Sequence, residues 1–105
     1  MPFSPAAEPE ALPHTQLAPR WQLILLDDDD HSYEYVVTML TRILGMSATE
    51  AWEHAREVDT TGASVVFTGP REQAEFHQER IHAWGPDPRI ARCAGSMTAC
   101  LEPLD

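Results

Sequence analysis

The sequence predicts an α+β fold in which a small antiparallel sheet of about three strands packs against three helices. Three observations predict it: short apolar runs typical of strands, apolar stripes of helical period between them, and glycine or proline at the boundaries. The elements follow the order β-α-α-β-α-β, which does not alternate as a doubly wound parallel sheet would. At 105 residues the chain has room for one hydrophobic core, so we expect a single domain.

The chain begins with a segment that does not fit this fold. Residues 1–19 contain five of the nine prolines and almost no periodic apolar pattern, so we expect a flexible N-terminal extension. The folded domain is expected to comprise residues 20–105. It opens on "RWQLILL", a short apolar run that fits a buried strand ending at Asp27.

Two consecutive helices are expected next. The first follows Ser32, a favourable N-cap, and ends at Gly45, with its apolar stripe formed by Tyr33, Val36, Val37, Leu40, Ile43 and Leu44. The second opens with a capping box, Ser47 three residues before Glu50, and runs through about Val58. Its inner face consists of small residues, which predicts close packing there: Ala51, Ala55 and Val58.

The second half of the chain supplies the remaining elements. A turn at Gly62 leads into a strand through Phe67, which Gly69 and Pro70 are expected to stop. A helix is expected over 71–84, with an inner face of Ala74, Ile81 and Trp84 and a charged outer face. "GPDP" ends that helix, and a last short strand is expected within 96–103.

The charge balance narrows the classes of partner. The chain has seventeen acidic residues and seven basic ones, all of them arginines, which gives a net charge of -10. Such a chain repels phosphate backbones and anionic lipid, so neither nucleic acid nor a membrane is an expected partner, whereas a cationic ligand is favoured. We find no apolar stretch of membrane-spanning length and no secretion signal, and we expect a cytoplasmic protein whose Cys93 and Cys100 are reduced thiols.

Four consecutive aspartates, residues 27–30, follow the first strand. A calcium loop counted from Asp27 would need glycine at its sixth position and glutamate at its twelfth, where this chain has Ser32 and Thr38. A phosphoryl-accepting receiver domain would need a lysine, and the chain has none. Two interpretations remain open: the acids line the N-terminus of the following helix, or they accept hydrogen bonds from an ammonium group.

Metal binding and catalysis are not expected. His77 and His82 are five residues apart, about 140° around a helix, so they do not share a face. His54 and Glu57 could share one, but two ligands make half a metal site. No serine or cysteine has a base and an orienting group at recognisable spacing, so we expect neither an enzyme nor a cofactor.

Several motifs, in order, resemble those of one family. They are the apolar strand followed by "DD" and an amphipathic helix, then "GMS", "VDTTG", "REQAE" and "CLEP". Together they make the segment from Trp21 to Leu104 similar to the ClpS family, adaptors that bring proteins with destabilising N-terminal residues (N-degrons) to the Clp ATP-dependent protease.

The resemblance implies a binding site for the first residue of a substrate protein. Its α-ammonium group would lie against Asp27, Asp28 and Asp59, where the family has asparagine, aspartate and histidine. Its side chain would enter a pocket formed by His31, Tyr33, Val36, Ala55, Val58 and Met97. Methionine is usual at the positions of Tyr33 and Ala55, so a tyrosine wall and the space beside a small alanine favour bulky aromatic first residues.

The resemblance also implies partners. A monomer would dock on a Clp AAA+ ATPase of the ClpA or ClpC type through Glu72 and His77, the latter standing where the family usually has lysine. The N-terminal extension would assist the delivery of substrates. Two other functions stay open: a diverged ClpS-like binding module with altered ligand specificity and no role in delivery, and a small acidic hydrolase or metal-dependent enzyme.

Overall fold

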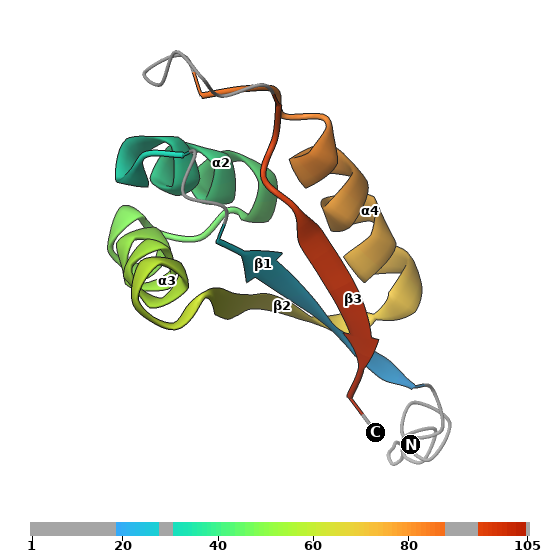
Figure 1. The fold of residues 1–105 in the computed structure, drawn as a ribbon. Coiled ribbons are helices and arrows are strands. Elements are labelled where there is room, and N and C mark those ends of the chain that lie inside the picture. Colours follow the sequence, from blue (N-terminus) through green and yellow to red (C-terminus); the bar gives the residue numbers. More distant parts are fainter. Residues whose placement is uncertain (1–18, 28–30, 88–94, 105) are drawn as a thin grey trace, which may run out of the picture.

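The computed structural model describes residues 19–27, 31–87 and 95–104, and it confirms the predicted α+β fold (Figure 1). Its elements are, in chain order, β1 (Arg20–Leu26), α2 (Tyr33–Leu44), α3 (Ala48–Thr61), β2 (Ala63–Pro70), α4 (Arg71–His82) and β3 (Ala99–Pro103). The expected flexible extension, apart from Pro19, lies outside the described residues, as do Asp28 and the two aspartates after it.

The sheet is antiparallel with the strand order β2-β1-β3. Because β1 is hydrogen-bonded on both edges, it forms the centre of the fold, and its Leu23 and Leu25 are completely buried. Helix α4 contacts all three strands, whereas α2 and α3 pack against each other and α3 also contacts β2. Figure 1 shows α2 and α3 together, with α4 running alongside the strands.

Strand β2 is longer than predicted, because it continues through Gly69 to Pro70 instead of ending at Phe67. The Phe67 ring lies against Gly69, where a Cβ atom would come within 2.8 Å of it, so glycine serves packing here and does not stop the strand. Pro70 pairs opposite Arg20 at the end of an edge strand, a place where the missing N–H is tolerated.

The predicted helix caps are confirmed. The Ser32 Oγ accepts a hydrogen bond from the Tyr35 N–H, and the Ser47 Oγ accepts one from the Glu50 N–H. Helix α3 nevertheless runs three residues beyond Val58, because the left-handed residue that ends it is Gly62 (φ 93°), whose N–H donates to the Val58 carbonyl.

The last helix and strand are both shorter than predicted. Helix α4 ends at His82, and Trp84 lies in a turn where its N–H donates to the Ile81 carbonyl. Strand β3 begins at Ala99. The Ser96 Oγ accepts a hydrogen bond from the Gly85 N–H at 2.5 Å, so Ser96 is tied to the loop after α4.

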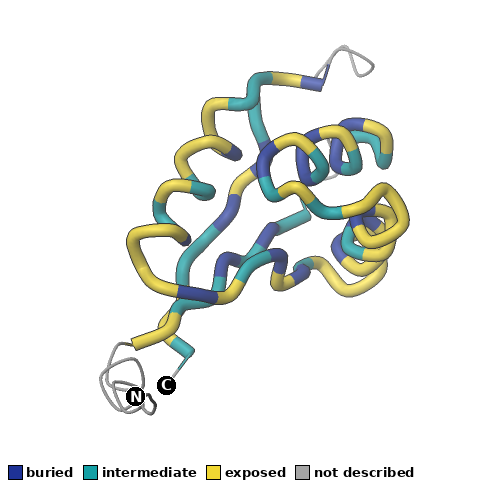
Figure 2. The backbone as a smooth tube through the Cα atoms, turned by 180° about the vertical axis from the view of Figure 1, so that it is seen from behind, coloured by how far each residue is buried: buried dark blue, intermediate teal, exposed yellow. Residues whose placement is uncertain are grey.

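Helix α2 is buried over a wider face than its stripe predicted. Tyr35 and Met39, which lie outside the stripe, are buried together with Val36, Leu40 and Ile43. The reason is that α2 contacts both α3 and α4. Figure 2 shows exposed residues interleaved with buried and half-buried ones along the helices.

The predicted inner faces of the other two helices are confirmed. Ala51, Ala55 and Val58 of α3 are buried, as are Ala74 and Ile81 of α4, while Trp84 is half-buried against the core. Within the described residues, no helix has both the length and the apolar character needed to cross a membrane.

Candidate functional site

A small cavity of about 20 Å³ lies where the end of β1, the start of α2, the second half of α3 and the segment before β3 meet. The structure brings together here every described residue that the sequence predicted for ammonium binding and for the side-chain pocket. The lining consists of Asp27, His31, Tyr33, Val36, Ala55, Val58, Asp59 and Met97. Asp28, the remaining predicted residue, lies outside the described residues.

Backbone hydrogen bonds bring these separate segments to one place. The Asp27 N–H donates to the Gly62 carbonyl at 3.0 Å, which ties the end of β1 to the end of α3. The Leu26 N–H donates to the Thr98 carbonyl, also at 3.0 Å, which ties β1 to the segment that carries Met97. The position of the cavity is therefore fixed by sheet-like pairing rather than by side chains alone.

The start of α2 is held by a residue that sequence reasoning missed. Asp87 is only 1% exposed, and its Oδ2 accepts a hydrogen bond from the Ser32 N–H at 2.6 Å. A carboxylate at a helix N-terminus satisfies a free N–H and is favoured by the helix dipole. The one available signal was an acidic residue between two prolines in "GPDP", and it did not indicate which helix it would reach.

One aromatic contact and two polar contacts complete the surroundings of the cavity. The His31 ring packs against Tyr35 with a centroid separation of 4.5 Å, and its Nε2 lies 2.9 Å from the Gly95 carbonyl. The Tyr35 hydroxyl donates to the Gly85 carbonyl. His31 thus connects the cavity to the loop between α4 and β3.

Tyr33, the first residue of α2, packs against α3 beside the cavity. Its hydroxyl donates to the Asp59 Oδ2 at 2.8 Å, and its ring is 5.1 Å from the Trp52 ring, centroid to centroid. Trp52 and Asp59 are two turns apart on one side of α3, with Ala55 between them on the same side. Only about 20 Å³ remains open beside Ala55, close to the room needed for one water molecule.

The hydrogen bond to Asp59 and the negative charges of Asp59 and Asp27 raise the pKa of the Tyr33 hydroxyl. The pKa of the Tyr33 phenol is raised above its usual 10.0, first by the hydrogen bond to Asp59, then by burial and by the charge of Asp59. The charge of Asp27 raises it further, while Arg56 lowers it. Since both carboxylates affect one hydroxyl, a positively charged group placed there would be attracted by both.

We expect the phenol of Tyr33 to ionise above pH 10 in the wild-type protein and closer to its usual pKa in Asp59→Ala. Because the folded-state pKa is raised, the stability contributed by the neutral phenol is present below pH 10 and lost as pH rises through that pKa. The chain has two tyrosines, so the phenolate absorbance of Tyr33→Phe, subtracted from that of the wild type, isolates Tyr33. Equal titration in the wild type and Asp59→Ala would contradict the hydrogen bond.

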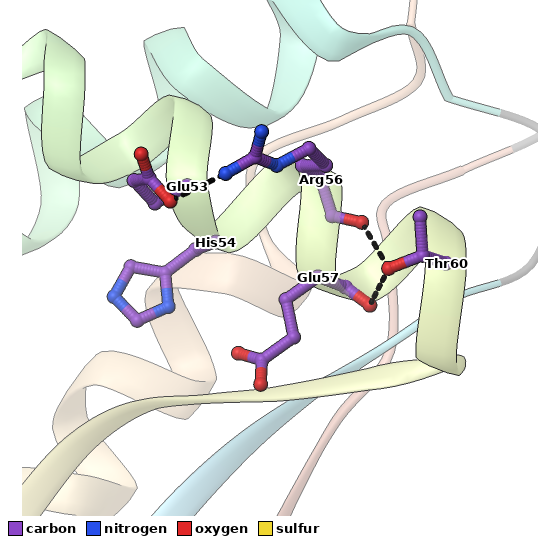
Figure 3. Close-up of a pocket in the computed structure, with 5 residues that line it drawn as sticks. All are labelled: Glu53, His54, Arg56, Glu57 and Thr60. Carbon is purple, nitrogen blue, oxygen red and sulfur yellow. Dashed lines mark hydrogen bonds and ion pairs between the residues drawn. The ribbon is translucent and has the colours of Figure 1, made fainter.

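A larger, open hollow of about 520 Å³ lies on the outer side of α3 (Figure 3), lined by Glu53, His54, Arg56, Glu57 and Thr60. The Ser64 hydroxyl, 3% exposed, lies 2.7 Å from the His54 Nδ1 and donates to the Glu57 Oε1. His54 and Glu57, which are too few ligands for a metal site, therefore satisfy a buried hydroxyl. In the part of the chain that the structure describes, no group of three His, Cys, Asp or Glu residues could hold a metal ion.

The two predicted docking residues lie on α4. Glu72 is exposed, whereas His77 is half-buried with its ring edge against Phe67, 4.7 Å between centroids. Burial, followed by the charge of Arg80, lowers the pKa of His77 below its usual 6.5. His77 is therefore mainly uncharged at neutral pH and does not supply the positive charge that a lysine would.

The chain is similar to known proteins in both sequence and fold. Residues 16–86 match the family model described as "ATP-dependent Clp protease adaptor protein ClpS". A ClpS adapter of Corynebacterium jeikeium is 34% identical over 88 residues, which cover 80% of this chain and 87% of the relative. A ClpS adapter of Thermosynechococcus vestitus is 33% identical over 64 residues, which cover 60% of this chain and 68% of the relative. The solved structure of Agrobacterium tumefaciens ClpS2 bound to L-phenylalaninamide shares the fold, with a TM-score of 0.70 at 22% identity, over 81% of this chain and 96% of that one.

Proposed function

The chain belongs to the ClpS family of ATP-dependent Clp protease adaptor proteins, and we propose that its cavity binds the N-terminal residues of substrate proteins for delivery to a Clp AAA+ ATPase. The observation that carries this proposal is the convergence of Asp27 and Asp59 on one small cavity with apolar walls. An α-ammonium group has three N–H donors and no acceptor, so two carboxylates beside an apolar pocket match a charged amine joined to a bulky side chain.

The proposed site has an ammonium part and a side-chain part. Asp27, Asp28 and Asp59 hold the ammonium group, with Asp28 assigned through the family resemblance. The pocket for the side chain is lined by His31, Tyr33, Val36, Ala55, Val58 and Met97. The similar Agrobacterium protein was solved with L-phenylalaninamide, an aromatic amino acid with a free α-amine, which supports a preference for aromatic first residues.

Delivery is the second part of the proposal. We propose that the chain acts as a monomer without catalytic activity and docks on an ATPase of the ClpA or ClpC type through α4, where Glu72 is exposed. His77 contributes shape rather than charge to that surface. Because the protease depends on ATP, the chain would work in a compartment that contains ATP, and we propose the cytoplasm.

Fluorescence anisotropy with short peptides that differ only in their first residue tests the binding step. We expect aromatic first residues to bind best and acetylation of the N-terminus to abolish binding, because acetylation removes the positive charge and two of the three donors. Equal binding of free and acetylated peptides would show that the chain reads something other than an N-terminus.

A degradation assay tests delivery separately from binding. Purified Clp ATPase and peptidase are given a folded reporter that begins with phenylalanine, with and without this chain. Faster degradation in its presence supports delivery. Peptide binding without faster degradation would favour a diverged binding module that has lost its connection to the protease.

A further inference from the structure

We propose that Tyr33 is an internal placeholder for the ligand, and that an N-terminal residue binds by exchanging with the Tyr33 side chain. This inference rests on the proposed function, since it concerns how the same cavity accepts its ligand. It makes Tyr33, together with Trp52 beside it, a determinant of which first residues are bound. Three features of the cavity carry it: a carboxylate that already accepts a hydrogen bond, a volume too small for a phenyl side chain, and the exposed Trp52 ring beside the half-buried Tyr33.

The first feature is the state of Asp59. Its Oδ2 accepts the Tyr33 hydroxyl at 2.8 Å, so one of the carboxylate oxygens proposed for the ammonium group already has a donor. An ammonium group that takes the place of that hydroxyl on Asp59 must first break this internal hydrogen bond, which it replaces by a charge-assisted one. The free energy of the internal hydrogen bond is therefore subtracted from the free energy of binding.

The second feature is volume. The cavity measures about 20 Å³, whereas a cavity that takes up benzene in a protein core is about 150 Å³. A phenyl side chain cannot enter without movement of a wall. Val36, Ala55, Val58 and Met97 are buried in the core, and the half-buried His31 is held by the Tyr35 ring and the Gly95 carbonyl. Tyr33 is half-buried at the first residue of α2, so it moves at the least cost in packing.

The third feature is the surface that Tyr33 would uncover. Trp52 is 43% exposed and already contacts the Tyr33 ring. When Tyr33 turns away, a flat side chain can take its place against Trp52, whereas an aliphatic side chain gives up the aromatic contact. The exchange therefore favours ligands that bring both an ammonium group and an aromatic ring.

The test compares peptides that begin with phenylalanine and with leucine. In Tyr33→Phe, which keeps the ring and removes the hydroxyl, we expect both peptides to bind about two- to tenfold more tightly, the range of one hydrogen bond. In Trp52→Leu, we expect the preference for phenylalanine over leucine to fall about two- to tenfold. Glu50→Gln, on an exposed position at the other end of α3, is the control.

The outcomes separate this inference from the proposed function. If the wild type binds and Tyr33→Phe binds equally or more weakly, the placeholder is overturned and the adaptor function stands. If only Tyr33→Phe binds measurably, the placeholder is supported. If neither the wild type nor any variant binds a free N-terminus, both proposals fail, and circular dichroism of each variant shows that this is not a loss of folding.

Discussion

Replacing both Asp27 and Asp59 by alanine is expected to weaken the binding of a peptide that begins with phenylalanine by about a hundredfold. Each carboxylate that accepts a hydrogen bond from an ammonium group contributes about 1.5 kcal/mol or more, which is roughly a tenfold change in affinity. Each single replacement should therefore cost about tenfold. Anisotropy titrations of the wild type, the two single variants and the double variant measure these steps.

The control for this prediction is a double variant with the same change in net charge. Glu50→Ala with Glu102→Ala removes two negative charges from exposed positions outside the cavity. Screening by salt keeps such distant charges from contributing much to a single contact. If this control weakens binding as strongly as the loss of Asp27 and Asp59, the ligand responds to the overall charge of the chain and not to a site.

Asp87→Ala is expected to lower the free energy of unfolding by about 2 to 3 kcal/mol. The replacement removes a hydrogen bond to a carboxylate and leaves the Ser32 N–H, at the start of α2, without that acceptor. It also leaves space at a position that is 1% exposed. Urea unfolding followed by circular dichroism gives the free energy of unfolding for each variant.

Asp87→Asn is the matched comparison, because the amide keeps the shape and an oxygen that can still accept from Ser32. We expect it to lose less stability than Asp87→Ala. If Asp87→Ala stays within about 0.5 kcal/mol of the wild type, the range of ordinary surface substitutions, Asp87 does not anchor α2.

Local sequence signals predicted most of the fold. Ser32 and Ser47 as N-caps, with Gly45 and Gly62 as the residues after α2 and α3, needed nothing beyond neighbouring residues. The wider burial of α2 was not predictable in this way. Tyr35 and Met39 are buried because a second helix, far along the chain, packs there, and a single stripe does not report a second partner.

The described residues that line the cavity were predictable, but the hydrogen bonds among them were not. From the sequence alone, the four consecutive aspartates fitted two roles, helix capping and cation binding. The family resemblance was needed to place Asp59 and Met97 at the same site. The hydrogen bond between Tyr33 and Asp59 joins residues 26 positions apart, and that between Ser32 and Asp87 joins residues 55 apart. Such bonds depend on how the segments meet in space, which periodicity does not encode.

The cavity is lined by four segments from three distant regions of the sequence, 27–36, 55–59 and 97. A ligand held there contacts all four, and the unfolded chain has no equivalent site, so occupancy opposes global unfolding by linkage. At a ligand concentration a hundred times the Kd this amounts to about 2.7 kcal/mol. The adaptor is therefore expected to resist unfolding and proteolysis best while a substrate is bound. That is also the state in which it would lie next to the Clp protease.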